Sequence, residues 1–169
     1  MNKSSLFFGG LFFLLFLLHS ASVKVFASAS FVPQFLLLFV IVFAATHSLP
    51  ETLWFSFGAG FLWETFSAEF FGAQIFALIF CGLGAYLVTR NITAQELAAP
   101  TAAFLVVGAT VLRPLLVAGY HAVASSLDLT SPIPFGTFLN PGVIYAALAN
   151  LLVFYLLRFL IRLFPQLSK

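Results

Sequence analysis

Charged residues are scarce in this chain. Only 7% of its 169 residues are Asp, Glu, Lys or Arg, whereas 62% are hydrophobic and 24 are phenylalanine. In a soluble domain about a quarter of all residues are charged, and they cover its surface. The scarcity therefore excludes a soluble globular protein and predicts an integral protein of the lipid bilayer. The net charge of +2 is also too small to indicate binding to nucleic acid.

Residues that carry chemistry are scarce as well. The single cysteine, Cys81, excludes an internal disulfide and a multi-cysteine metal site. The single aspartate, Asp128, lies in a predicted loop, and no serine has a convincing histidine–carboxylate pair. The chain has no HExxH motif and no glycine pattern that binds phosphates or dinucleotides. We therefore expect a protein that is not an enzyme and that carries no cofactor or metal.

Long apolar runs are what the chain has in abundance. A helix needs about 20 residues to cross the hydrocarbon core of a bilayer, and 169 residues allow six such helices with short connections. The runs are continuous rather than alternating, which argues against a β-barrel. We predict an all-α, polytopic integral membrane protein that forms a single domain. Its spans lie near residues 5–25, 31–47, 50–67, 72–89, 100–124 and 141–162.

Basic residues orient these spans. With six spans, Lys24 stands alone on one side of the membrane. The other side holds both termini and five basic residues, namely Lys3, Arg90, Arg158, Arg162 and Lys169. Because Lys and Arg are enriched on the cytoplasmic side, we predict that both termini are cytoplasmic. The first span is alternatively a secretory signal peptide, since Ala27-Ser28-Ala29 is similar to a cleavage site.

Two charged residues fall inside predicted spans. At 1.5 Å per residue, Arg113 lies about 18 Å into the fifth span and Glu64 about 20 Å into the third. An unpaired charge at such a depth is costly, so we predict a Glu64–Arg113 pair, with Glu69 as the alternative partner of Arg113. The simpler interpretation is that the pair fixes the register of two helices. The alternative is a polar site that a ligand or a partner engages.

Two further residues of the fifth span are notable. Pro114 follows Arg113 directly and is expected to kink the helix and free a backbone carbonyl. His121 is expected to make a single helix–helix hydrogen bond.

Small residues recur at every fourth position of the fourth span, at Ala73, Ala77, Cys81 and Ala85. On a helix this spacing places them on one face, as a smooth ridge. Ridges of small residues allow transmembrane helices to pack closely in lipid. We therefore expect this small-residue ridge to contact the helix of a partner protein.

The stretch 58–87 resembles a known family. Gly60-Phe-Leu-Trp-Glu64 is followed by Gly72, eight residues after Glu64, at the start of the next span. A glycine-rich third span with G-x-x-x-D, then seven residues and a glycine, is typical of the rod shape-determining protein MreD family. Glu64 stands where that family usually has aspartate, which keeps the charge and lengthens its reach.

The resemblance implies a non-enzymatic scaffold of the bacterial cell-wall elongation complex in the inner (cytoplasmic) membrane. The implied partners are an MreC-like membrane-anchored protein and, through it, wall-synthesis enzymes. The implied fold is similar to the six-helix substrate-binding subunit of energy-coupling-factor transporters. That similarity supplies an alternative function, a small-solute-binding subunit of such a transporter with residues 125–139 as a lid.

Overall fold

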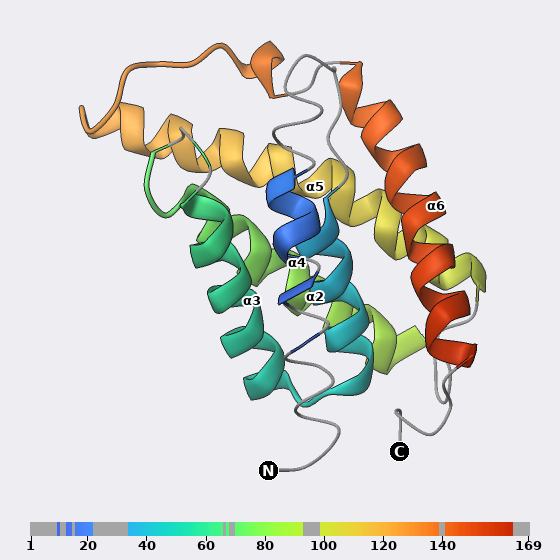
Figure 1. Cartoon of the computed structure of the whole chain (residues 1–169). Coiled ribbons are helices and arrows are strands. Elements are labelled where there is room, and N and C mark those ends of the chain that lie inside the picture. Colours follow the sequence, from blue (N-terminus) through green and yellow to red (C-terminus); the bar gives the residue numbers. More distant parts are fainter. Residues whose placement is uncertain are drawn as a thin grey trace.

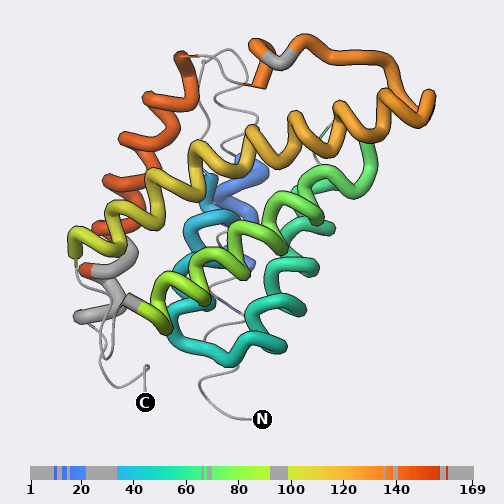
Figure 2. Tube along the Cα trace, turned by 180° about the vertical axis from the view of Figure 1, so that it is seen from behind, coloured from blue at the N-terminus to red at the C-terminus, as the bar shows by residue number. Residues whose placement is uncertain are grey.

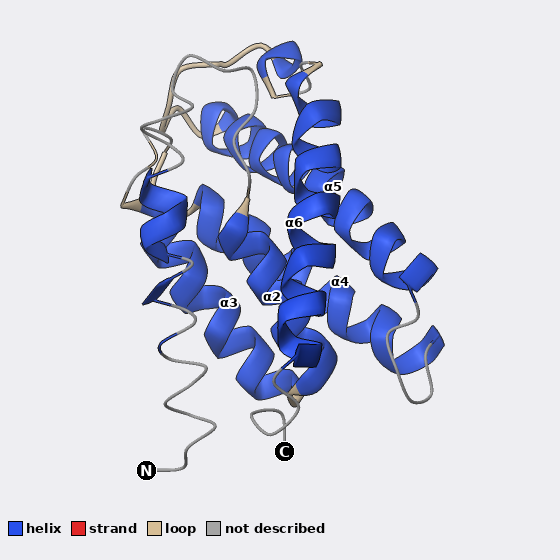
Figure 3. Cartoon of the chain, turned by 45° about the vertical axis from the view of Figure 1, so that its right-hand side comes forward, coloured by secondary structure: helices blue, strands red, loops and turns tan. Residues whose placement is uncertain are grey.

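The computed structural model describes residues 10, 13–14, 16–21, 34–65, 67, 70–92, 99–138 and 141–163. Every regular element in these ranges is a helix, as predicted (Figure 3). In chain order the elements are α2 (Phe35–Thr46), α3 (Leu49–Glu64), α4 (Ala73–Ile92), α5 (Ala99–Ser126), the short 3-10 helix η1 (Phe135–Thr137) and α6 (Gly142–Leu163). Helices α2 to α6 begin and end within a few residues of the predicted spans.

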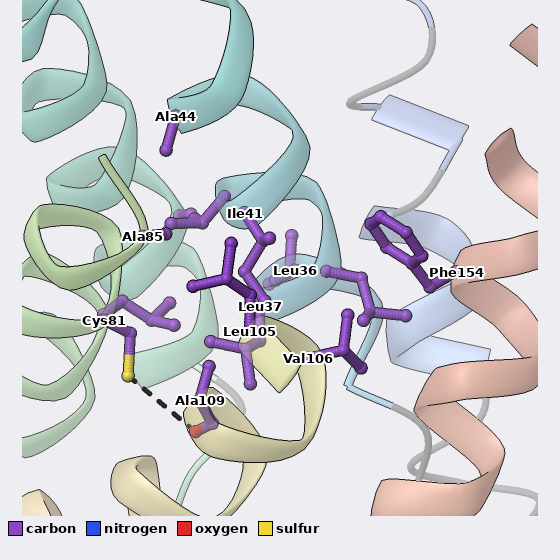
Figure 4. Close-up of a cluster of buried hydrophobic side chains, with 14 of the residues drawn as sticks. Leu36, Leu37, Ile41, Ala44, Cys81, Ala85, Leu105, Val106, Ala109 and Phe154 are labelled. Carbon is purple, nitrogen blue, oxygen red and sulfur yellow. Dashed lines mark hydrogen bonds between the residues drawn. The ribbon is translucent and has the colours of Figure 1, made fainter. Parts of the chain in front are cut away.

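Helix α2 forms the centre of the bundle. It packs against α3, α4, α5 and α6, and lies between them in Figure 1. Its residues from Leu36 to Ile41 are all buried, because a helix that is apolar on every side is stable only when its whole surface is covered. Figure 4 shows this core, in which Leu37 and Ile41 of α2 belong to one cluster with Leu105 and Val106 of α5.

Helices α3 and α4 form a tightly packed antiparallel pair, the α3–α4 hairpin. Gly60 makes the close approach possible, because a Cβ at this position would lie 2.6 Å from the Cα of Ile75. Gly72 begins the second arm with a φ of +99°, a left-handed conformation that side-chain-bearing residues rarely adopt. The two glycines of the predicted motif therefore serve the same hairpin, Gly60 at the contact between its helices and Gly72 in its turn.

Helix α5 is the longest element, with 28 residues, or about 42 Å at the rise of an α-helix. It lies alongside α4 and continues past the start of that helix (Figure 2). The hydroxyl of Tyr120 donates a hydrogen bond to the carbonyl of Phe71, 3.1 Å away, in the turn of the α3–α4 hairpin. The far end of α5 is thus fixed over this turn, and residues 127–138 lead from there back toward α6 (Figure 1).

Within the described part of the chain, two helices are long and apolar enough to cross a membrane, α4 over Ala73–Asn91 and α5 over its whole length. Helix α2 is apolar but shorter, and its 12 residues extend about 18 Å. Large apolar side chains are exposed on the outer faces, among them Trp54, Phe104 and Leu152.

Part of the first predicted span is described. Residues 16–21 are helical, and the buried ring of His19 lies 4.5 Å from that of Trp63 on α3, centroid to centroid. The cleavage-like residues 27–29 lie outside the described part of the chain, as do Lys3, Lys24 and Lys169. Arg158 and Arg162 fall within α6, and their side chains are not among those described.

The hairpin packing predicts opposite effects for two glycines of α3. Gly60→Ala should lower the free energy of unfolding by about 1–3 kcal/mol, the usual cost of overpacking, because the new methyl group meets backbone atoms that cannot rotate away. Gly58→Ala is the matched control, since nothing lies within 4 Å of a Cβ there; it should be neutral or stabilise by up to about 1 kcal/mol. Thermal unfolding of the purified variants measures both, and equal shifts would contradict the close contact.

Candidate functional site

Polar and aromatic side chains gather where α3 ends, α4 begins and α5 crosses them. We call this group the hairpin cluster and define it as Trp63, Glu64, Gln74 and Arg113. Glu64 is the last residue of α3, and Gln74 is the second residue of α4. Arg113 comes from the middle of α5. The cluster therefore joins three helices at one end of the α3–α4 hairpin.

Glu64 acts as a cap for α4. Its Oε2 atom accepts hydrogen bonds from the backbone N–H groups of Gln74 at 3.0 Å and of Ile75 at 3.4 Å. These N–H groups belong to the first turn of α4, where a helix has no partners of its own for them. The positive end of the helix dipole also favours a carboxylate at this place. A carboxylate that is only 6% exposed is stabilised here by main-chain donors.

Arg113 is held by the two neighbours of this cap. Its Nε donates a hydrogen bond to the Oε1 atom of Gln74, 3.0 Å away. Its guanidinium carbon lies 4.1 Å from the centroid of the Trp63 ring, well within the range of a cation–π contact. The planar guanidinium group suits both contacts at once, which a lysine ammonium does not.

The predicted direct pair between Glu64 and Arg113 is replaced by a connection through Gln74. Gln74 gives its main-chain N–H to the carboxylate and receives the Arg113 donor on its side-chain oxygen. Arg113 lies in the middle of α5 and beside the second residue of α4, because α5 continues past the start of that helix. Glu69, the alternative partner, lies outside the described residues.

Gly72 and Pro114 complete the surroundings of the cluster. A Cβ on Gly72 would lie 2.7 Å from the hydroxyl of Tyr120, so this glycine also makes room for the hydrogen bond that fixes α5. Pro114 is buried, and α5 continues through it as one helix from Ala99 to Ser126 rather than ending there.

The small-residue ridge lies inside the protein. Its four members are at most 3% exposed, and the thiol of Cys81 approaches the carbonyl of Ala109 on α5 (Figure 4). Ala73 and Ala77 pack with Val117 of α5, whereas Cys81 and Ala85 belong to the central core. The expectation that this ridge contacts a partner is therefore wrong, because helices of the same chain already cover it.

A second buried polar group escaped the sequence analysis. The side-chain oxygen of Asn150 on α6 accepts a hydrogen bond of 2.8 Å from the backbone N–H of Gln34, and its NH₂ donates one of 2.9 Å to the hydroxyl of Thr110 on α5. Asn150 and Thr110 are fully buried. These bonds tie α6 to α5 and to the start of α2. An asparagine in the middle of an apolar run was the signal that could have revealed them.

His121 departs from its prediction. It is only 3% exposed, and neither of its ring nitrogens has a hydrogen-bond partner. Its ring lies 5.5 Å from that of Phe138, centroid to centroid, in the connection between α5 and α6. The expected helix–helix hydrogen bond is thus absent from this side chain.

No family model, no curated protein and no solved structure matches this chain. Within the described residues, no group of three or more His, Cys, Asp and Glu side chains is placed to hold a metal ion. Both charges of the hairpin cluster are engaged by other parts of the protein. The cluster therefore fits the simpler interpretation, in which it fixes the arrangement of α3, α4 and α5.

The cap predicts a graded series at Glu64. Glu64→Ala should cost about 1–3 kcal/mol, because it leaves buried N–H groups of α4 without an acceptor. Glu64→Gln should cost less, since its side-chain oxygen can still accept from Gln74. Chemical or thermal unfolding of the purified variants gives the order. A result in which Gln is as harmful as Ala would show that charge, rather than capping, is what matters.

The Gln74 connection predicts energetic coupling between two residues that are 39 positions apart. In a double-mutant cycle, Gln74→Ala and Arg113→Ala should show an interaction of about 0.5–3 kcal/mol, as for residues in direct contact. The charge exchange Glu64→Arg with Arg113→Glu should not rescue either single variant, because an arginine at 64 cannot accept the N–H groups of α4. Rescue by the exchange would instead establish a direct pair.

Proposed function

We propose that the chain is a polytopic helical membrane protein that acts as a scaffold of the bacterial cell-wall elongation complex, as its resemblance to the MreD family implies. In this proposal it lies in the inner membrane with both termini in the cytoplasm. It binds an MreC-like membrane-anchored protein and, through it, wall-synthesis enzymes. The first predicted span and helices α2 to α6 make six spans, as in the substrate-binding subunit of energy-coupling-factor transporters.

The observation that carries the proposal is the α3–α4 hairpin. The resemblance depends on residues 60, 64 and 72, and all three have a role in this one hairpin. Gly60 permits the contact with α4, Glu64 caps that helix, and Gly72 adopts the left-handed conformation of the turn. Three motif residues that act together in one structural element support a shared fold better than the same three residue types at unrelated places in the structure would.

The outer surface supports a location in lipid. Trp54 is 75% exposed, Phe104 69% and Leu152 71%, and these residues lie on three different helices, α3, α5 and α6. Exposed apolar side chains on several faces are expected where hydrocarbon, rather than water, surrounds a protein. The outward faces, not the small-residue ridge, are therefore the surfaces that the proposal offers to partner helices.

Both ends of the α3–α4 hairpin carry a basic and an acidic residue, Arg90 and Glu51 at one end and Arg113 and Glu64 at the other. The proposed orientation therefore depends on the sequence, in which Lys and Arg are more numerous on the side that holds Arg90 and both termini. The Arg90 end is proposed to face the cytoplasm.

Site-specific photocrosslinking in native membranes tests the proposal. A photoreactive amino acid is placed singly at Trp54, Phe104 and Leu152, with the fully buried Leu78 as the control position. Crosslinked material is purified and identified by mass spectrometry. We expect one outward face to capture a single-span, MreC-like protein, the other faces to capture lipid, and Leu78 to capture neither.

Other outcomes distinguish the alternative. Capture of a membrane coupling protein that co-purifies with a pair of cytoplasmic ATPases would make the chain a transporter subunit and overturn the scaffold. The scaffold would also be contradicted if all three outward positions captured only lipid and the purified crosslinked material contained no wall-synthesis enzyme.

A further inference from the structure

The end of the α3–α4 hairpin opposite the hairpin cluster holds two opposite charges on one peptide group. The Oε2 atom of Glu51 accepts a hydrogen bond of 2.9 Å from the backbone N–H of Ser48. A guanidinium nitrogen of Arg90 donates one of 3.4 Å to the carbonyl oxygen of His47. That N–H and that carbonyl belong to the same planar peptide group. The carboxylate oxygen and the guanidinium nitrogen therefore lie at most about 9 Å apart.

Both charged groups can be reached from outside the bundle. Glu51 and Arg90 are exposed. Glu51 makes its two hydrogen bonds to Ser48 through Oε2, and its Oε1 accepts none from a described residue. A guanidinium group has five N–H donors, and the bond to His47 uses one of them. The ring of Tyr86, 5.5 Å from the guanidinium carbon, helps to hold this group in place.

An apolar groove begins beside these charges. Its volume is about 390 Å³, and it is lined by one face of α3, at Leu49, Pro50, Leu53, Trp54 and Phe57. This volume lies within the range of ligand sites, about 300–1,000 Å³. Leu49 follows Ser48 directly, and the groove extends from there about 12 Å along the helix. Trp54 is 75% exposed and Phe57 42%, so a molecule next to the bundle can enter the groove.

A charged end followed by an apolar groove is complementary to a molecule with a charged head and an apolar tail. We infer that this face of α3 binds one phospholipid with an ethanolamine headgroup. The phosphate accepts from Arg90, the ammonium donates to Glu51, and an acyl chain lies in the groove. The inference rests on the proposed location in a membrane. In the proposed orientation the charged end faces the cytoplasm, so the lipid belongs to the cytoplasmic leaflet.

The two charges select this headgroup. In phosphatidylethanolamine a two-carbon link separates the phosphate from the ammonium, so one headgroup can contact both Arg90 and Glu51. Phosphatidylglycerol has no cation for Glu51, and the carboxylate repels its negative charge. Phosphatidylcholine has a cation, but three methyl groups replace the N–H donors that would bind the carboxylate. Each of these two lipids therefore satisfies only part of the site.

Native mass spectrometry of the purified full-length chain tests the site. The protein in detergent micelles is titrated with phosphatidylethanolamine, phosphatidylcholine and phosphatidylglycerol that carry the same acyl chains, and the bound fraction is measured. We expect the ethanolamine lipid to bind about tenfold more tightly than either of the others, the effect of one hydrogen bond to a charged group. Equal binding of the three lipids would indicate ordinary boundary lipid and overturn the inference.

Single variants test the parts of the site. Glu51→Gln can still accept from the N–H of Ser48, but it should remove the preference for ethanolamine over glycerol. Arg90→Gln should weaken the binding of all three lipids about tenfold, because each has a phosphate. Trp54→Ala should weaken all three without changing their order. Phe104→Ala, the matched control on α5, should bind as the wild type does.

Unchanged selectivity in the Glu51 variant, or unchanged affinity in the Arg90 variant, would contradict the site. The measurement is independent of the scaffold, because the purified chain has no partner protein. Selective lipid binding without capture of a wall-synthesis partner would support the site and leave the scaffold unsupported. Capture of that partner with equal binding of the three lipids would support the scaffold and overturn the site.

Discussion

The arrangement of α3, α4 and α5 depends on one interaction, the acceptance by the Glu64 carboxylate of main-chain N–H groups of α4. A buried carboxylate is costly unless donors surround it, and the first turn of a helix has donors without partners. The N–H groups of α4 thus offset the cost of burying the carboxylate, and the carboxylate gives these N–H groups the acceptor that the helix lacks. Because the acceptor belongs to α3 and the donors to α4, the hydrogen bonds also set how far one helix can slide along the other.

The same turn explains why a charge on α5 is tolerated. Arg113 lies near the negative charge of Glu64, and Gln74 connects the two residues. The main-chain N–H of Gln74 donates to Glu64, and its side-chain oxygen accepts a hydrogen bond from Arg113. Trp63 provides a face for the guanidinium group. This arrangement lies at the end of α3 and the start of α4, where main-chain donors of α4 are available to the Glu64 carboxylate.

Sequence reasoning succeeded where the signal was local. Helix positions followed from apolar runs, and the importance of Gly60, Glu64 and Gly72 followed from their spacing. It failed where the answer depended on how helices cross. The sequence did not reveal that Gln74 lies between Glu64 and Arg113, because the crossing of α5 over the start of α4 is a tertiary feature. The ridge of α4 was correctly seen as a packing surface, but sequence could not tell whether the opposing helix belonged to the same chain.

The burial of that ridge changes what the proposed binding of a partner helix would require. In lipid, apolar side chains gain little from leaving hydrocarbon for another apolar surface, so helix association depends on close packing and on polar contacts. The small residues that allow the closest approach between helices are buried inside the bundle, between α4 and its neighbours α2 and α5. The outward faces carry large side chains such as Trp54 and Leu152. In the proposed scaffold, a partner would therefore have to fit the shape of these side chains or engage the polar ends of the bundle.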